Sequence, residues 1–584
     1  MFESDHRQKL WSSLDRERDL LIIGGGITGV GILRESARVG LDALLVEQRD
    51  FAWGTSSRSS KLVHGGLRYL QHLQVGLTRA SVRERERLLG EAPGLIDPLG
   101  WLLANYEGDS PGRWMFSAGL SVYDLLALHW SHRHYDALDF QQIAPHISSQ
   151  GLQGGFRYGD AQTDDARLVL RLLQEALDDG GEAINYTRVD SLLRDEAGHV
   201  VGATLTDQVN GESQSVTARL VINATGAWAD KTREPLGLAA ELRPLRGSHL
   251  IFPGNRLPVA QAISFLHPID RRPVFVFPWE GISLVGTTDV DHRIDLDQEP
   301  CISPEEVSYL MAAVQYRFPS LELELTDILS TFAGVRPVID TGKAKPSDES
   351  RDHVIWQDSG MITVTGGKLT TFRLIAHETL KHARKVMPDL PQIEPKQPVL
   401  DASDPTEFQQ FELEQNVRQR LVGRYGTHAT DVITSDDPSL FDPIPGTNTL
   451  WVELVHAARR EGVVHLDDLL LRRVRIGLLL PHGGIALLPY IRELVQSELG
   501  WSDEKWMEEE ETYLDLWARC YASPEPENVP DWHDDLQEAM RMRRMRRRDR
   551  ARMKSRIVAA GLTAIALVLT VFFFLNRDKP NENH

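Results

Sequence analysis

Residues 20–29 read LLIIGGGITG, and this stretch decides the fold. The apolar run at 20–23 predicts a short buried strand, and the pattern after the glycines predicts a helix to about Val39. Residues 41–47, LDALLVE, predict a second buried strand. A strand, a glycine turn, a helix and a strand form a βαβ unit, whose two strands lie parallel in one sheet. The sequence therefore predicts an α/β fold.

The glycines carry the pattern G-x-G-x-x-G, formed by Gly24, Gly26 and Gly29. The first permits a tight turn, the second lets the backbone approach a pyrophosphate, and the third lets the helix pack closely on the strand. The helix N-terminus offers N–H groups and a positive dipole to that anion. Glu47, 23 residues after Gly24, can accept both ribose hydroxyls and repel a 2′-phosphate. The pattern predicts a dinucleotide site without separating NAD from FAD; a ligand-free glycine turn is the alternative.

A second motif, TSSRSSKLVHGGLRYL, occupies residues 55–70. Its hydroxyls, glycines, lysine and histidine suit a polar ligand, because hydroxyl and backbone N–H groups bind phosphate oxygens and flavin edge atoms. The alternative is a serine-rich surface loop, which does not explain the His-Gly-Gly and Arg-Tyr ending of the motif.

Together these motifs resemble the FAD-dependent glycerol-3-phosphate dehydrogenases of the aerobic, respiratory type. Further matches follow in order: DDARL at 164–168, NATGAW at 223–228, RGSH at 246–249, GTTD at 286–289, GVRP at 334–337 and GGKLTT at 366–371. The resemblance is dense over about 19–380 and loose beyond, where DDLLLRR at 467–473 matches best. Long motifs in a fixed order make the resemblance specific.

The resemblance implies an FAD-dependent oxidoreductase core at 19–390. This core combines a glutathione-reductase-like FAD-binding Rossmann domain with an interleaved mixed-sheet substrate domain. The FAD-binding segments are expected at about 19–90, 155–240 and 330–390, and the substrate-domain segments at about 91–154 and 241–329. Residues 390–405 are rich in Pro and Asp and predict a linker, and residues 400–540 predict a C-terminal helical domain, interpreted as a solvated module.

The resemblance also implies an activity: oxidation of sn-glycerol 3-phosphate to dihydroxyacetone phosphate, with hydride transfer from C2 to flavin N5 and electrons passed to a membrane quinone. FAD is expected to bind non-covalently, since neither cysteine falls in a flavin motif. The sequence shows no metal-ligand spacing. The alternatives are a glycerol-3-phosphate oxidase using O2, an amine or amino-acid oxidase of the same fold group, and a non-catalytic membrane-tethered scaffold.

The site residues follow from these motifs. We expect the following residues to bind the cofactor: Gly24, Gly26, Gly29, Glu47, Thr55, Ser56, Ser57, Ser60, Lys61, Leu62, His64, Gly65, Ala224, Gly226, Gly367, Leu369 and Thr370. We expect the following to bind the substrate, whose phosphate needs fixed cations: Arg68, Tyr69, Thr287 or Thr288, Arg336 and Lys368. The expected catalytic set is Arg336 with His64 or His249, the two alternatives for the base that removes the C2 hydroxyl proton.

Composition limits the function classes. The chain has 584 residues, and Lys+Arg 64 against Asp+Glu 84 gives a net charge of −20. This balance argues against a general nucleic-acid binder, whose surface is basic. Cys301 and Cys520 are the two cysteines, so a disulfide framework and a cysteine-rich metal or iron–sulfur site are excluded. Low cysteine usage favours a reducing compartment.

The C-terminus departs from this acidic balance. Residues 541–556 hold ten Lys or Arg and one Asp, and residues 557–575, IVAAGLTAIALVLTVFFFL, carry no charge over 19 positions. A helix of that length spans about 28 Å, close to a hydrocarbon core. We predict a basic juxtamembrane strip and a transmembrane helix that anchors the chain in the lipid bilayer. A buried helix and a nucleic-acid patch are the alternatives.

These features predict the location of the catalytic body. The first 20 residues lack the apolar segment of a signal peptide, and the basic strip favours the inner side of a membrane. We therefore expect the body on the cytoplasmic side of the inner membrane, held by a C-terminal anchor. The identity of the quinone and the assembly state, with a homodimer as one option, stay open.

Overall fold

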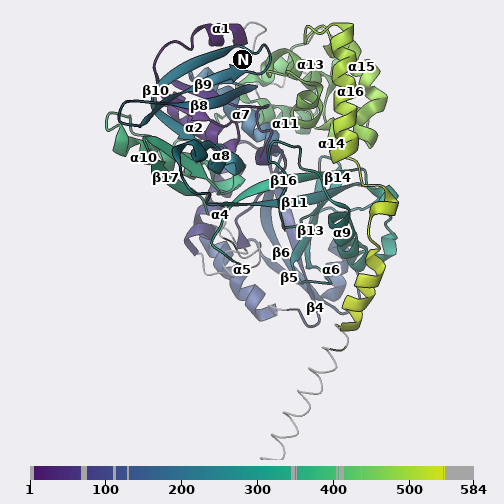
Figure 1. Ribbon diagram of the computed structural model, residues 1–584. Helices are drawn as coiled ribbons and strands as arrows, with labels where there is room; N and C mark the ends of the chain where they lie inside the picture. The colour runs from purple at the N-terminus through teal and green to yellow at the C-terminus, as the bar shows by residue number, and fades with distance from the viewer. Residues whose placement is uncertain are drawn as a thin grey trace, which may run out of the picture.

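The computed structural model describes residues 6–67, 75–109, 113–127, 130–343, 349, 352–402, 406, 413–435, 437–542 and 545. These residues form two β-sheets with flanking helices and a group of C-terminal helices beside them (Figure 1). The predicted α/β architecture with a C-terminal helical domain is confirmed.

The first sheet contains the predicted βαβ unit. β1 (Arg18–Ile23) and β2 (Ala43–Val46) pair in parallel, and α2 (Ile27–Arg38) connects them. The strand order is β17-β18-β10-β1-β2-β7, with β9 beside β10 and β8 beside β9. The other strands are β7 (Glu182–Ile184), β8 (Thr187–Arg194), β9 (Val200–Asp207), β10 (Ser213–Asn223), β17 (Val354–Asp358) and β18 (Met361–Thr365).

Both faces of this sheet are covered, which explains why β1 is apolar throughout. Leu20 and Ile22 pack with the helices on one face, and Leu21 and Ile23 pack with β8, β9 and α1 on the other. The helices concerned are α1 (His6–Ser12), α2, α7 (Asp165–Asp178) and α10 (Phe372–Val386). A ligand can therefore approach the sheet only at the strand ends.

The second sheet is mixed, with the order β15-β11-β14-β13-β12-β4-β6-β3, β16 beside β11 and β5 beside β6. β12 and β4 are parallel, and β11 and β16 are antiparallel over ten residue pairs. The strands are β3 (Leu62–Val63), β4 (Ile96–Tyr106), β5 (Arg133–Tyr135), β6 (Leu152–Thr163), β11 (Leu242–Pro253), β12 (Ala262–Leu266), β13 (Pro273–Trp279), β14 (Ile282–Gly286), β15 (Val290–Asp291) and β16 (Ser330–Ile339).

The chain crosses between the two sheets at places other than the expected boundaries. β6 and β16 are both strands of the second sheet, where β6 lies beside β4 and β16 lies beside β11. The segments starting at 155 and 330, which contain most of these strands, were expected to belong to the FAD-binding part. Both strands are long, and their main pairing partners, β4 for β6 and β11 for β16, are distant in sequence. The helices near this sheet are α4 (Val75–Glu91), α5 (Arg113–Ala127), α6 (Ala137–Ile143) and α9 (Pro304–Arg317), whereas α8 (Ala229–Arg233) contacts β18 of the first sheet.

The C-terminal helices share one core with the second sheet. Trp506, Tyr513 and Leu478 belong to the same buried cluster as Phe277 and Phe332 of the sheet. The interpretation as a solvated module is therefore wrong for the inner faces of these helices. They are α11 (Gln415–Tyr425), α12 (Ala429–Ile433), α13 (Trp451–Arg460), α14 (Ile476–Leu479), α15 (Leu488–Val495) and α16 (Asp503–Cys520).

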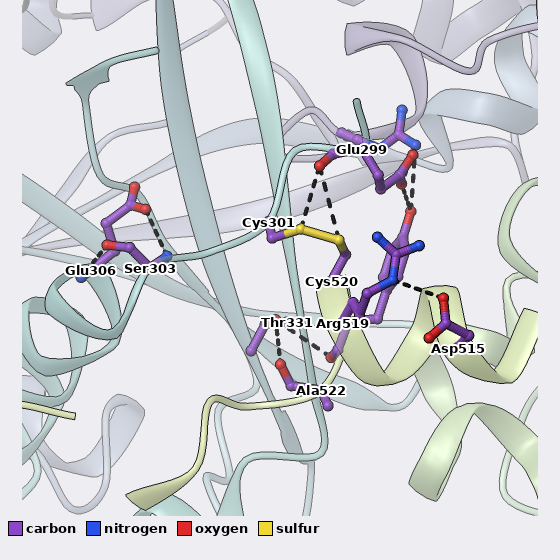
Figure 2. Close-up of a disulfide and its surroundings, with 11 residues drawn as sticks. Glu299, Cys301, Ser303, Glu306, Thr331, Asp515, Arg519, Cys520 and Ala522 are labelled. Atoms are coloured by element: carbon purple, nitrogen blue, oxygen red, sulfur yellow. Dashed lines mark hydrogen bonds and ion pairs between the residues drawn. A yellow bond between two sulfur atoms is a disulfide. The ribbon is translucent and has the colours of Figure 1, made fainter. Parts of the chain in front are cut away.

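Cys301 and Cys520 form a disulfide that joins the loop before α9 to the end of α16 (Figure 2). The sequence excluded a framework of several disulfides, but its composition did not indicate this single bond. The pairing depends on a contact between residues 219 positions apart, which no local pattern encodes.

Within the described residues, no helix combines the length and the apolar composition needed to cross a bilayer. The predicted transmembrane helix at 557–575 lies outside the described residues. So does the basic strip at 541–556, apart from residues 541, 542 and 545.

Candidate active site

A cavity of about 390 Å³ opens at the carboxyl ends of β1, β2, β10 and β18. Ile23 and Val46, the last residues of β1 and β2, line it together with Ala224 and Thr365. Ligands in open α/β sheets bind at this edge, where the loops after parallel strands converge. The cavity is therefore the candidate cofactor site.

The glycine turn at the floor of the cavity has the geometry that a dinucleotide requires. Gly24 has φ +116°, and a Cβ there would lie 2.6 Å from the carbonyl oxygen of Ala224. A Cβ on Gly29 would lie 1.9 Å from the carbonyl oxygen of Gly24, so α2 packs directly on the turn. Gly26 is the N-cap of α2 and lines the cavity. The N-terminal end of this helix thus faces the space where a pyrophosphate would bind.

Two polar side chains border this turn. The Ser56 hydroxyl accepts the backbone N–H of Ile27 at 2.9 Å and so caps α2 from the serine-rich loop. The Glu47 carboxylate accepts N–H groups from Gly25 at 2.7 Å and Arg49 at 2.8 Å. Burial raises the pKa of Glu47. Its oxygens keep further lone pairs for the ribose hydroxyls, so the residues present fit a dinucleotide.

The structure divides the predicted cofactor residues into two groups. Those that line the cavity are Gly24, Gly26, Glu47, Thr55, Ser56, Ala224, Gly226, Gly367 and Leu369. Those outside the lining are Gly29, Ser57, Ser60, Lys61, Leu62, His64, Gly65 and Thr370. Several members of the second group instead hold the serine-rich loop in place. For example, the His64 N–H donates to the Thr370 hydroxyl at 3.1 Å.

Lys61 is the clearest case of such support. Its Nζ donates to the Ser57 carbonyl at 2.7 Å and to Asp165 at 2.8 Å, and the side chain is fully buried. Burial, and then the nearby charge of Arg475, lower the pKa of Lys61 to about 7. Arg475 of the C-terminal domain donates to the same Ser57 carbonyl at 2.8 Å and to Asp165 at 2.6 Å. Two buried cations, Lys61 and Arg475, therefore hold the serine-rich loop in place by donating to the Ser57 carbonyl.

Arg336 lies beside the cofactor cavity on β16. Its guanidinium crosses Gly247 of β11, where a Cβ would come within 2.1 Å of Nη2. Nη1 contacts the Asp289 carboxylate at 3.1 Å, and Nη2 donates to the Thr287 hydroxyl at 3.1 Å. The Thr288 hydroxyl instead donates to the buried Glu306 at 2.6 Å. Arg336 also donates to the Thr288 carbonyl at 3.4 Å, so both threonines lie beside the predicted phosphate-binding arginine, but only Thr287 contacts it through its hydroxyl.

His249 follows Gly247 on the same face of β11. Its Nε2 lies 2.9 Å from the Ser60 hydroxyl, and its ring stacks on Phe332 at 4.5 Å. Burial, and then the charges of Arg336 and Lys61, lower the pKa of His249 well below the ordinary value of 6.5. The imidazole is therefore neutral at pH 7 and can accept a proton, and the ring is buried and does not line the cavity itself.

Among the other predicted substrate residues, Lys368 lines the cavity, as does Pro337, the neighbour of Arg336. Arg68 and Tyr69 lie outside the described residues.

Sequence reasoning missed the far end of the cavity. Residues 187–192, at the start of β8, line it, together with Trp53, Trp228 and Asp297. The Trp228 indole N–H donates to Asp297 at 2.7 Å. Trp228 stood inside the NATGAW match and could have been assigned. Residues 187–192 carry no motif, since their position comes from the packing of β8 beside β2.

Two family models match the chain. The model described as FAD dependent oxidoreductase covers residues 19–381, and the model described as C-terminal domain of alpha-glycerophosphate oxidase covers residues 401–506. Curated relatives include the aerobic glycerol-3-phosphate dehydrogenase of Staphylococcus epidermidis, 33% identical over 494 residues, which are 80% of this chain and 88% of the relative. That of Staphylococcus aureus is 33% identical over 497 residues, covering 81% and 89%.

Solved structures give a similar result. Glycerol-3-phosphate dehydrogenase from Bacillus halodurans, complexed with FAD, superposes with a TM-score of 0.71 at 28% identity, covering 89% of this chain and 98% of that one. L-alpha-Glycerophosphate oxidase from Mycoplasma pneumoniae, with FAD bound, has a TM-score of 0.53 at 19% identity, covering 67% and 99%. The second likeness shows a shared fold only.

Proposed function

The chain belongs to the FAD-dependent oxidoreductases and, among them, to the aerobic glycerol-3-phosphate dehydrogenases, and from this premise we propose that it oxidises sn-glycerol 3-phosphate to dihydroxyacetone phosphate. The observation that carries the proposal is the placement of Arg336 and His249. A fixed cation and a neutral imidazole lie on adjacent strands beside a dinucleotide cradle. That pair suits a substrate with a phosphate at one end and a hydroxyl to deprotonate at the other.

FAD, when bound, supplies the acceptor for the C2 hydride at flavin N5. The N-terminal end of α2 and the Gly24–Gly26 backbone hold its pyrophosphate, and Glu47 accepts its ribose hydroxyls. Arg336 binds the substrate phosphate through paired N–H donors, which Thr287 and Asp289 keep oriented, and Lys368 adds a second positive charge.

His249 is the base that we favour over His64. Its Nε2 lies 2.9 Å from the Ser60 hydroxyl, so the C2 hydroxyl proton would pass to Ser60 Oγ as Ser60 gives its own proton to Nε2. Stacking on Phe332 fixes the plane of the imidazole.

We further propose that the electron acceptor is a membrane quinone. An apolar face on α5 supports this proposal. It is formed by residues 114, 115, 118, 122 and 125, which lie along one side of the helix. Within it, the side chains of Trp114 and Leu125 are 83% and 68% exposed. Apolar patches of this kind mark lipid or protein contacts. In Figure 1, α5 and the end of the described chain, which leads toward residues 557–575, lie at the same end of the molecule.

We propose accordingly that the body rests on the cytoplasmic face of the inner membrane and that residues 557–575 anchor it in the lipid bilayer. Because the remainder of the chain is acidic, anionic headgroups repel it, and the basic strip at 541–556 is the main segment that they attract. A homodimer stays a prediction.

Anaerobic flavin absorbance tests the function. Adding sn-glycerol 3-phosphate to the FAD-loaded protein should bleach the flavin bands, and a short-chain quinone should restore them faster than air does. Faster recovery in air would assign the protein to the glycerol-3-phosphate oxidases. Flavin that does not bleach would overturn the substrate proposal, and amines and amino acids would be tried next.

A further inference from the structure

We propose that the Cys301–Cys520 disulfide is a redox switch that controls how firmly the serine-rich loop holds FAD. The inference rests on the proposed function in taking FAD as the ligand of the cavity and the cytoplasm as the location of the body. It concerns regulation of cofactor binding by the C-terminal domain, through residues outside the reaction centre.

The position of the disulfide suits a switch between two parts of the fold. It ties the loop before α9 to the last residue of α16, across 219 residues of sequence (Figure 2). Cys520 is 2% exposed, whereas Cys301 is only partly buried, so Cys301 is the more exposed end of the bond. In a cytoplasmic protein, as proposed above, disulfides are rare and usually serve redox sensing.

Glu299 connects the disulfide to the flavin loop. Its backbone carbonyl oxygen lies 3.3 Å from the Cys301 sulfur and 3.9 Å from the Cys520 sulfur. Its carboxylate accepts hydrogen bonds from the Arg58 guanidinium and the Tyr521 hydroxyl. Tyr521 directly follows Cys520, so one residue from each side of the disulfide meets at Arg58.

Arg58 transmits this connection to the cavity. It ends the short helix η1 (Thr55–Ser57), donates to the Gly54 carbonyl at 3.3 Å and lies 4.7 Å over the Trp53 ring. Gly54 and Trp53 line the cavity, as do Thr55 and Ser56. Arg58 is 5% exposed, and losing its charged partner in that environment is costly.

Opening the disulfide therefore weakens the support that Arg58 gives to the loop, which acts beside the contacts of Lys61 and Arg475. With the bond intact, Glu299 and Tyr521 are held at fixed separation around Arg58. After reduction, the two thiols can donate to the Glu299 carbonyl, and the end of α16 is no longer bound to the loop before α9. The contacts from Lys61 and Arg475 to the Ser57 carbonyl do not involve either cysteine. Reduction should thus weaken cofactor binding while the fold persists.

The redox step balances with an external dithiol as reductant. One of its thiolates attacks a sulfur of the Cys301–Cys520 bond, which breaks to give a mixed disulfide, and its second thiol resolves that intermediate. The protein gains two electrons and two protons as two thiols, and the reductant becomes a disulfide. A low-molecular-weight disulfide reverses the exchange.

The test is a redox titration of the FAD-loaded full-length protein in buffers of reduced and oxidised dithiothreitol. Alkylation and mass spectrometry count the thiols, and flavin fluorescence measures the dissociation constant of FAD. We expect the constant to rise by about tenfold in the reduced form, the scale of one weakened hydrogen bond between charged groups. Circular dichroism in both states checks that the protein stays folded.

Variants separate the switch from a merely structural bond. The C301S/C520S protein should show the weaker FAD binding in every buffer. Glu299→Gln keeps both cysteines but should bind FAD weakly and lose the redox response. Asp515→Asn removes the partner of Arg519 at 2.8 Å, an exposed pair in the last turns of α16, and should retain the full response.

Three results would overturn the inference: equal FAD affinity in the two redox states, cysteines that stay reduced throughout the titration, or a full response in Glu299→Gln. Failure of the proposed function is distinguishable. Tight FAD binding without bleaching by glycerol phosphate would refute the substrate alone, and bleaching with a redox-independent FAD affinity would refute the switch alone.

Discussion

Arg336 shows how a single backbone position creates a substrate site. The guanidinium lies where any side chain on Gly247 would stand, and Thr287 and Asp289 hold its two ends. The antiparallel register of β11 and β16 pairs Gly247 with Gly334 and places Arg336 two residues further along the strand. A glycine in a strand interior often marks such a close approach.

Replacing Arg336 by alanine should lower kcat/KM for sn-glycerol 3-phosphate by about ten- to thousandfold, equivalent to about 1.5–4 kcal/mol of lost charged hydrogen bonding. FAD content, read from the flavin absorbance, should not change. Arg256→Ala, which removes an exposed arginine paired with Asp327, is the matched control and should behave as the parent protein. Unaltered kinetics in Arg336→Ala would remove the residue from the substrate site.

His249 gives a prediction about pH. Its pKa lies well below the ordinary value of 6.5, first because of burial and then because of Arg336 and Lys61. The imidazole is therefore neutral at pH 7 and loses its function as a base only when the pH falls below its lowered pKa. The kcat/KM profile should stay flat from pH 7.5 down to 6.5 and fall at lower pH.

The choice between the two histidines can be made by mutation. His249→Gln should lower kcat by about 100-fold or more and abolish the acid limb of the profile, while His64→Gln should keep that limb. An acid limb that survives in His249→Gln and disappears in His64→Gln would assign the base to His64.

At the scale of elements, the loop that follows β2 depends on the C-terminal domain. η11 (Asp468–Arg473) and the residues after it send three arginines into the FAD-binding part: Arg472 and Arg473 to Asp50, and Arg475 to Asp165 and the Ser57 carbonyl. All of these side chains are buried. The C-terminal domain therefore forms part of the support of the cofactor site.

Arg475→Gln should destabilise the protein by about 3–5 kcal/mol, because it removes one partner of a buried charge cluster. It should also raise the pKa of Lys61 above about 7, since the charge of Arg475 lowers that pKa. Thermal unfolding and FAD retention measure the outcome. Arg492→Gln, in an exposed pair with Asp503 at 2.6 Å, is the control and should cost under about 1 kcal/mol. Equal stability of the two variants would contradict the proposed role of Arg475.

How far the sequence predicts this structure depends on the range of the interactions. The turn from Gly24 to Gly29 was predictable because its geometry is set within a few residues. The positions of Arg336 and Lys368 followed from the family motifs. The sequence could not predict that the Thr287 hydroxyl contacts Arg336 while the Thr288 hydroxyl does not. The Thr288 hydroxyl instead donates to Glu306, which lies 18 residues later in the chain. Residues 187–192 and the Cys301–Cys520 bond depend on packing between distant segments, which periodicity does not report.

At the scale of the whole molecule, its two ends expose different kinds of side chain, apolar at one end and acidic toward the other. The apolar row on α5 lies at one end in Figure 1, and the upper part of α16, with its acidic exposed positions, lies toward the other. A protein with one apolar end can orient itself on a bilayer before any spanning segment is considered. The two means of attachment can therefore be measured separately.

Protein lacking residues 541–584 should still bind anionic vesicles through α5. The double variant Trp114→Ser/Leu125→Ser in that background should lower the vesicle-bound fraction by at least about tenfold, because each side chain loses about 1.5–3 kcal/mol of apolar burial. Vesicle flotation measures it. Met507→Ser, which removes an exposed apolar residue of α16, should have no effect. Complete loss of binding on tail deletion alone would show that α5 does not contact lipid.

The pairing of Asp50 with Arg473 sets an order of events during synthesis. The two residues are 423 positions apart, and the carboxylate accepts from the guanidinium at 2.5 and 2.8 Å. At about 5–20 residues per second, a ribosome needs about 20–85 s to travel from one to the other. During that interval the nascent chain holds Asp50 without its main counter-charge. The loop after β2 can therefore reach its final form only when residues 1–473 of the 584 have been made, before synthesis of the apolar segment at 557–575.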